Sequence, residues 1–197
     1  QSMVTLSSVL VSVALCFALG VPLGIIASYN ERFRNIQNVI LDAMQTLPYF
    51  CYLIPVLMFF GGNIVSAVIA TVIYSVPPII RLTALGLSQV SGSYSEVSKS
   101  FGGTGIQTLN KVKFPLAVPS LVMGFNQTVI MAFAMQIVTP LIGGKGLGLQ
   151  VFNALQRSDT GRGLSAGLAI VLLAIIIDRI SHAWTKKQRI ALGLDNN

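Results

Sequence analysis

SYSEVSKSFGGTGIQTLNKVKFP, residues 93–115, is a polar stretch that lies between two long apolar runs of the chain. The quartets at 93–96 and 104–107 both match a capping box, in which side chains bond to the free amides of a helix start. The glycine pair at 102–103 separates the quartets, and Pro115 is expected to stop the second helix and start the next apolar run. Helices this short are marginal alone in water. We therefore expect them to dock against another surface.

The composition is that of an integral membrane protein. Of the 197 residues, 53% are hydrophobic and only 10% are charged, whereas a soluble domain has about 25% charged residues. The formal charge of +7 could suggest nucleic-acid binding. The basic residues, however, stand singly at the ends of apolar runs, which is how membrane proteins are oriented. We therefore expect a lipid bilayer around the chain and no nucleic-acid partner.

Apolar runs divide the chain into membrane spans. A helix needs about 20 apolar residues to cross a bilayer, and five runs reach that length. They are Met3–Tyr29, Ile36–Phe60, Asn63–Leu87, Leu116–Ile142 and Gly163–His182. We expect an all-α polytopic bundle that forms a single transmembrane domain over residues 1–197, with loops at 88–115 and 143–162. Because the chain begins with Gln1 rather than Met, we also expect further sequence to precede it.

The distribution of Lys and Arg predicts the orientation of the bundle, because these residues favour the cytoplasmic side. Three of them, Lys145, Arg157 and Arg162, lie on the side of the 143–162 loop, and the other ten lie on the opposite side. The ten are Arg32, Arg34, Arg81, Lys99, Lys111, Lys113, Arg179, Lys186, Lys187 and Arg189. This predicts that loop 88–115 and the C-terminus are cytoplasmic and that loop 143–162 is external.

Two pairs of glycines are spaced four residues apart within spans. Small residues at this spacing let helix backbones approach closely in lipid. We interpret these glycines as helix-packing positions rather than ligand contacts. They are Gly20 and Gly24 in the first span, and Gly163 and Gly167 in the fifth.

The sequence offers no set of residues for catalysis or metal binding. It has no Gly-x-x-x-x-Gly-Lys-Ser/Thr phosphate loop, and the similar run at 143–146 lacks the spacing and lies on the external side. His182 is the single histidine, and no Ser-His-Asp or paired-carboxylate set is apparent. We expect a chain that binds no cofactor of its own, does not hydrolyse ATP and moves a solute rather than transforming it.

Polar residues within spans are candidates for a solute path. Such residues are costly in lipid and usually face a bundle interior or a water-filled cavity. Tyrosine rings attract cations through cation–π contacts, and side-chain amides can form hydrogen bonds with polar groups of a solute. The alternative is interhelical packing, with amides bonded across the bundle. The path candidates are Gln45, Tyr49, Asn126 and Gln136.

The 93–115 stretch resembles the cytoplasmic signature of the membrane subunits of ATP-binding-cassette importers. That signature is Glu-Ala-Ala, three residues, Gly, nine residues and Ile-x-Leu-Pro. This chain has the same spacing and keeps the Glu, Gly and Pro, with Val and Ser in place of the two alanines, and Val and Phe in place of Ile and Leu. The matching positions are Glu96, Val97, Ser98, Gly102, Val112, Phe114 and Pro115.

Further segments are similar to the glycine betaine/proline betaine branch of these permeases. They are QTLPYF at 45–50, YLIP at 52–55, PPIIRLT at 77–83, NQT at 126–128, GGKGLG at 143–148 and IIIDR at 175–179. The resemblance implies the type I importer permease fold and transport of a quaternary-ammonium or related osmolyte, such as glycine betaine, proline betaine, choline or trimethylamine N-oxide.

The resemblance also implies a set of partners in the bacterial inner membrane. Two ATPase subunits, which bind ATP and Mg²⁺, would dock on Glu96–Pro115. A second permease copy would complete the path, and an external binding protein would deliver the solute to the region of loop 143–162. Three alternatives stay open: an amino-acid importer permease, an ion-coupled carrier that works alone, and a membrane scaffold without transport.

Overall fold

The computed structural model describes the backbone of residues 1–191 and the side chains of residues 1–183. Within that range, the regular elements are all helical. In chain order they are α1 (Ser2–Tyr29), α2 (Glu31–Thr46), α3 (Phe50–Phe60), α4 (Ile64–Ser75), α5 (Pro77–Ser88), α6 (Gly92–Ser100), α7 (Gly105–Thr108), the π-helix η1 (Leu109–Lys113), α8 (Phe114–Met135), the 3₁₀-helix η2 (Thr139–Ile142), α9 (Leu147–Gln156) and α10 (Thr160–Ala191).

Four stretches of helix are long and apolar enough to cross a membrane. They correspond to the first, third, fourth and fifth spans expected from the sequence, and they are Ser2–Tyr29, Ile64–Ser88, Gly105–Met135 and Thr160–Ala183.

The second expected span, 36–60, is divided into two helices. It consists of α2 and α3, which meet at an angle of 95°. A proline disfavours helical backbone in the residue before it, and Leu47, which precedes Pro48, is extended with ψ 132°. Helix α2 therefore ends at Thr46, and the chain turns before α3 begins.

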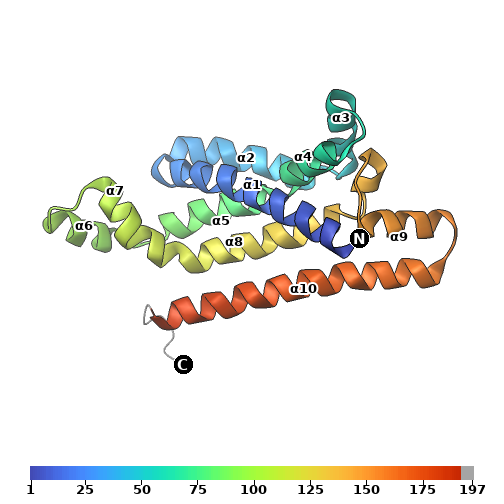
Figure 1. The fold of residues 1–197 in the computed structure, drawn as a ribbon. Coiled ribbons are helices and arrows are strands. Elements are labelled where there is room, and N and C mark those ends of the chain that lie inside the picture. The colour runs from blue at the N-terminus through green and yellow to red at the C-terminus, as the bar shows by residue number, and fades with distance from the viewer. Residues whose placement is uncertain (192–197) are drawn as a thin grey trace.

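The centre of the bundle is α5, which packs against α1 on one side and α8 on the other. Helix α10 runs along α8 and α9 at the edge of the bundle (Figure 1). Figure 1 also shows that α6 and α7 protrude at one end, whereas the turn from α9 to α10 lies at the opposite end. The polar 93–115 stretch and the 143–162 loop are thus on opposite ends of the molecule, as the Lys/Arg distribution requires.

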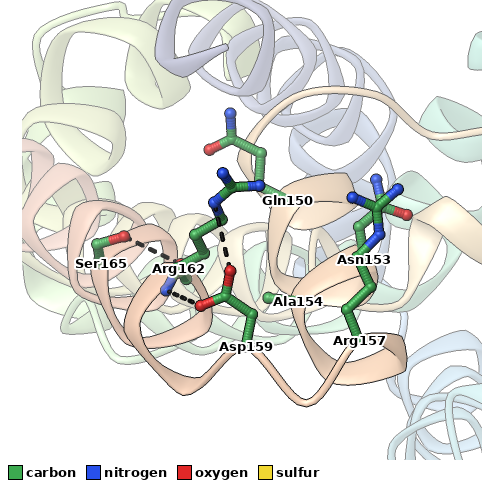
Figure 2. A pocket seen from close by; sticks show the side chains of 7 residues that line it. All are labelled: Gln150, Asn153, Ala154, Arg157, Asp159, Arg162 and Ser165. Carbon is green, nitrogen blue, oxygen red and sulfur yellow. Dashed lines mark hydrogen bonds and ion pairs between the residues drawn. The ribbon is translucent and has the colours of Figure 1, made fainter.

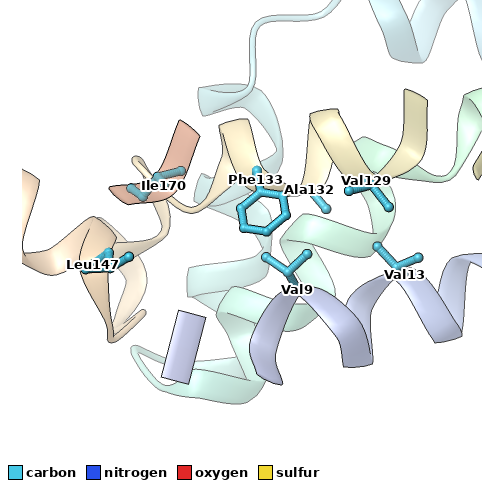
Figure 3. Close-up of a cluster of buried hydrophobic side chains, with 7 residues drawn as sticks. All are labelled: Val9, Val13, Val129, Ala132, Phe133, Leu147 and Ile170. Carbon is cyan, nitrogen blue, oxygen red and sulfur yellow. The ribbon is translucent and has the colours of Figure 1, made fainter. Parts of the chain in front are cut away.

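Two apolar clusters hold the ends of the bundle together. Near the α9 end, residues from α1, α8, α9 and α10 pack around Phe133 (Figure 3). Near the α6–α7 end, Leu87, Ala117 and Leu121 are buried, with Leu109 and Phe114 packed against them. The second cluster fixes the base of the protruding loop to the core.

The two glycine pairs lie in different surroundings. A Cβ at Gly20 would lie 2.5 Å from Ile79 Cγ2, and one at Gly24 would lie 2.5 Å from Thr83 Cβ and 2.8 Å from the Ile80 carbonyl oxygen. Helix α1 therefore touches α5 at both positions. A Cβ at Gly163 would meet Ala154 of α9 at 3.4 Å, whereas one at Gly167 would have nothing within 4 Å among the described residues.

Candidate functional site

The first half of the protruding loop is helix α6 and the turn that ends it. The amide of Gly102 donates to the Lys99 carbonyl at 2.9 Å, and the amide of Gly103 donates to the Ser98 carbonyl at 2.9 Å. These two bonds form a Schellman motif, which requires left-handed backbone at the residue after the C-cap. Gly102 occupies that position with φ +77°. The glycine of the signature is therefore the residue that lets α6 end and the chain reverse.

The second half begins with a capping box at Thr104, as the sequence predicts. The amide of Thr104 donates to Gln107 Oε1 at 2.9 Å, and the amide of Gln107 donates to Thr104 Oγ1 at 3.4 Å.

The other predicted capping box, at 93–96, is wrong. Ser91 occupies the N-cap of α6, so Ser93 lies inside the first turn. Its hydroxyl pairs with Ser91 Oγ at 2.8 Å instead of capping the helix.

The prediction that Pro115 separates the loop from the next span is also wrong. Helix runs without interruption from Gly105 to Met135. The π-turn of η1 ends at Lys113, two residues before the proline, and the Phe114 amide bonds back to the Leu109 carbonyl. Because Pro115 has no amide hydrogen to donate, a widened turn ahead of it accommodates the ring without ending the helix. Helices α7 and α8 are therefore parts of one continuous helical stretch.

Contacts within the loop hold α6 and α7 together and fix them to the bundle. The hydroxyls of Ser98 and Thr108 lie 2.8 Å apart and join α6 to α7. Lys113 Nζ lies 5.0 Å from the centre of the Tyr29 ring, which is within the range of a cation–π contact between the loop base and the end of α1.

The seven signature positions fall into three groups in the structure. Glu96 and Val97 are exposed on α6, Ser98 and Gly102 build the turn, and the other three form the partly buried base of the loop. The residues of the base are Val112, Phe114 and Pro115.

Large apolar side chains project from the loop into water. The exposed fractions are 88% for Phe101, 74% for Ile106, 56% for Val97 and 55% for Tyr94. A hollow of about 630 Å³ lies between α6 and α7, with Phe101 and Val97 on its rim. Exposed apolar groups gathered in this way are typical of protein, membrane or ligand interaction sites. Phe101 is not among the site residues expected from the sequence, although a bulky apolar residue beside the Gly102 turn was a usable signal.

The four candidate path residues do not share one environment. Gln45 and Tyr49 are exposed at the break between α2 and α3, and the Tyr49 ring lies beside that of Phe50, with ring centres 4.6 Å apart and planes tilted by 44°. Asn126 and Gln136, in contrast, are buried, with exposed fractions of 6% and 2%. Neither amide atom of Asn126 has a hydrogen-bond partner among the described residues, and the same holds for Gln136 Nε2. An unpaired buried polar group costs about 1–3 kcal/mol, so these amides are not explained by interhelical bonding within the chain.

An ion pair joins α2 to α5. Arg81 Nη2 lies 2.5 Å from Asp42 Oδ1, and the two side chains line a hollow of about 490 Å³ that also includes Arg34 and Ser88. The side chain of Asp42 is 63% exposed and that of Arg81 is 38% exposed. Charged groups within spans face a water-filled cavity or a neighbouring helix rather than lipid. This face of α2 and α5 is therefore polar over part of its length.

No group of three or more His, Cys, Asp or Glu side chains could hold a metal ion in the part of the chain that the structure describes. His182 is 3.4 Å from Asp178 Oδ1, one turn earlier on α10. The main features of the described residues are a protruding loop with exposed apolar side chains at one end, buried amides in the core and a polar face on α2 and α5.

Residues 20–190 match the family described as binding-protein-dependent transport system inner membrane component. The chain belongs to this family. It is a family of multi-pass membrane permease subunits, which are not themselves ATPases. The resemblance found in the sequence is thereby confirmed.

Two relatives are similar over nearly the whole chain. The chain is 44% identical to the glycine betaine transport system permease protein OpuAB of Bacillus subtilis, over 94% of this chain and 66% of the relative. It is 43% identical to the glycine betaine/proline betaine transport system permease protein ProW of Escherichia coli, over 96% of this chain and 53% of the relative. The chain thus spans about half to two thirds of the length of these relatives.

A solved structure confirms the expected fold. An inward-facing conformation of the MetNI methionine ABC transporter superposes with a TM-score of 0.81, covering 94% of this chain and 93% of the matched one. Sequence identity is 20%, so this likeness concerns the fold alone. The expected all-α bundle with the type I importer permease fold is therefore confirmed.

Proposed function

We propose that the chain is the membrane-spanning permease subunit of an ATP-driven importer for quaternary-ammonium or related osmolytes. Glycine betaine and proline betaine are the first candidate solutes, because OpuAB and ProW are named for them. Choline and trimethylamine N-oxide are further candidates, because they also carry a methylated, positively charged nitrogen. The observation that carries the proposal is the 93–115 loop, whose exposed apolar residues stand on a turn connected through one continuous helix to α8.

Energy for transport comes from separate ATPase subunits. They bind ATP and Mg²⁺ and dock on Glu96–Pro115, so this chain needs no nucleotide site. Closure of the ATPase pair pulls on α6 and α7, and the unbroken helix transmits that movement to α8 in the bundle. The exposed side chains Val97, Phe101 and Ile106 supply the apolar contacts.

The assembled importer contains a second permease copy and an extracytoplasmic binding protein. Loop 88–115 and the C-terminus lie in the cytoplasm, loop 143–162 lies outside, and the membrane is the bacterial inner membrane. Residues 192–197 of the C-terminus lie outside the described residues. Support for this orientation comes from the ten-to-three distribution of Lys and Arg and from the opposite placement of the two loops.

The deciding experiment is ATP hydrolysis by the complex in proteoliposomes. We expect the solute-loaded binding protein to stimulate hydrolysis with glycine betaine or proline betaine and not with amino acids such as methionine. Stimulation by amino acids alone would favour the amino-acid importer. Uptake that persists without ATP and collapses with the ion gradient would favour an ion-coupled carrier, and a complex without any stimulation would favour a scaffold.

The variant Asn126→Leu tests whether Asn126 lines the solute path or only packs between helices. Because leucine replaces an unpaired buried amide with an apolar group of similar size, we expect the melting temperature of the purified protein to hold or to rise by a few degrees. If Asn126 contacts the solute, uptake falls roughly tenfold at the same time, which corresponds to about 1.4 kcal/mol.

Thr128→Val is the matched control, because Thr128 Oγ1 is also buried and has no hydrogen-bond partner in the described part of the chain. We expect this variant to keep wild-type uptake. Normal uptake by Asn126→Leu, measured in proteoliposomes of equal protein content, would contradict the assignment of Asn126 to the path.

A further inference from the structure

At the end of the bundle opposite α6 and α7, helices α9 and α10 enclose a polar hollow of about 380 Å³ (Figure 2). Its volume suits one or two side chains. Figure 2 shows Arg162 between Asp159, to which it is bonded, and Gln150. The polar side chains that line the hollow are Gln150, Asn153, Arg157, Asp159, Arg162 and Ser165.

The local sequence builds this hollow from two helix ends. Gln150, Asn153 and Arg157 are spaced so that they share one face of α9 and its C-cap. The chain then reverses at Ser158, the one residue other than glycine with positive φ in the described chain. Asp159 next caps α10, because its Oδ1 accepts a hydrogen bond from the Arg162 amide at 3.1 Å. The hollow is therefore held in shape by backbone geometry.

The charges in the hollow are unbalanced. Arg162 Nε lies 3.3 Å from Asp159 Oδ2, whereas Arg157 has no acidic partner among the described residues. The hollow thus carries a net charge of +1, and the guanidinium and amide groups offer several N–H donors. A carboxylate matches this arrangement, since a guanidinium can donate two parallel hydrogen bonds to it.

The exposure of these groups indicates that the carboxylate belongs to a protein rather than to a small solute. The Arg162 side chain is 77% exposed, and Arg157 is exposed as well. Exposed ion pairs change affinity by less than about tenfold each, which is too little to hold a small anion alone. No aromatic ring lines the hollow, so nothing there suits a quaternary ammonium. Exposed charges at the rim of a large interface do, however, speed association and fix its register.

We propose that this hollow receives a surface carboxylate, from an Asp or Glu side chain, of the extracytoplasmic binding protein. The inference rests on the proposed function, which supplies that partner and the external position of loop 143–162. It adds the contact residues, Arg157 and Arg162, and the acidic chemistry of the partner surface that they recognise.

The test measures how much solute-loaded binding protein half-saturates ATP hydrolysis by the complete complex in proteoliposomes. We expect the double variant Arg157→Gln/Arg162→Gln to raise that concentration roughly tenfold at low salt, with an unchanged maximal rate. The difference from wild type shrinks as salt is added, because screening weakens the wild-type attraction. Lys145→Gln is the matched control, since Lys145 is an exposed cation in the same loop outside the hollow.

A variant that binds the binding protein more tightly excludes misfolding as the cause, because a misfolded permease would not gain affinity. Asparagine caps a helix about as well as aspartate, so Asp159→Asn keeps the start of α10 and releases Arg162. We expect the half-saturating concentration to fall below that of wild type, by roughly two- to fivefold.

Three results would overturn the inference while the proposed function stands. In the first, the double variant has the same half-saturating concentration of binding protein as Lys145→Gln. In the second, the double variant has a lowered maximal rate of ATP hydrolysis and an unchanged half-saturating concentration. The third is hydrolysis stimulated by free glycine betaine without binding protein and lost in the double variant, which would assign the hollow to the solute. A wild-type complex that the binding protein does not stimulate would instead contradict the proposed function, and the inference with it.

Discussion

Gly24→Ala is expected to destabilise the protein by about 1–3 kcal/mol, the usual cost of forcing an extra group into a packed interface. The new Cβ would lie 2.5 Å from Thr83 Cβ and 2.8 Å from the Ile80 carbonyl oxygen. The carbonyl belongs to the backbone of α5, so the clash is not relieved by a rotamer change and α1 must move away. The loss corresponds to a fall in melting temperature of roughly 5 °C for a chain of this size, measured by thermal unfolding of the purified protein.

Gly167→Ala is the matched control for this change. It introduces the same methyl group into a helix at a position with nothing within 4 Å among the described residues. Alanine has the higher helix propensity, by about 1 kcal/mol, so we expect unchanged or slightly raised stability. An equal loss of stability in both variants would contradict the assignment of the clash to α5. A loss at Gly167 in the assembled complex alone would indicate that another helix covers this face of α10.

Spacing alone could not separate these two glycine pairs. A four-residue interval shows that a helix can be approached closely, but the helix that approaches is set by the fold. Gly20 and Gly24 meet α5, which follows about 60 residues later. The same limit applies to the Asp42–Arg81 ion pair, whose members are 39 residues apart. The sequence places Asp42 within the second expected span, but it does not identify Arg81 as the residue that pairs with it.

The spans were predictable because their length and apolar composition are local properties. The break between α2 and α3 was not. Prolines are tolerated within membrane helices when neighbouring groups replace the lost hydrogen bond, so Pro48 was compatible with a kink as well as with the 95° turn observed. Pro115 illustrates the opposite outcome, because helix continues through it after one π-turn. Which of the two a proline produces depends on the contacts around it.

In the 93–115 loop the glycine turn and the second helix start were predictable, whereas the start of α6 and the direction of Phe101 were not. The capping box at Thr104 and the glycine pair at 102–103 follow from local chemistry and are present. The start of α6 was misplaced by two residues because two serines compete for the N-cap. The outward direction of Phe101 depends on the Schellman turn, and the order of residue types alone does not determine it.

Phe101→Ala is expected to lower retention of the ATPase by roughly tenfold to a hundredfold while leaving the permease folded. The Phe101 side chain is 88% exposed, so it contributes little to the packing of this chain. Burying a phenylalanine side chain against a partner stabilises the complex by about 1.5–3 kcal/mol, and each 1.4 kcal/mol is a factor of ten in affinity. The measurement is the amount of ATPase that co-purifies with tagged permease at matched expression, together with the melting temperature of the permease alone.

Leu155→Ala is the matched control, because Leu155 is 70% exposed on α9 at the opposite end of the bundle. We expect this variant to retain the ATPase at the wild-type level. Glu96→Lys tests the charged part of the same surface, and it should also weaken retention because Glu96 is exposed on α6 beside Val97. If Phe101→Ala and Glu96→Lys both keep wild-type retention and wild-type stimulated hydrolysis, the ATPase does not dock on this loop. In that case no ATPase moves the continuous helix from Gly105 to Met135, and the mechanism proposed for the chain is wrong.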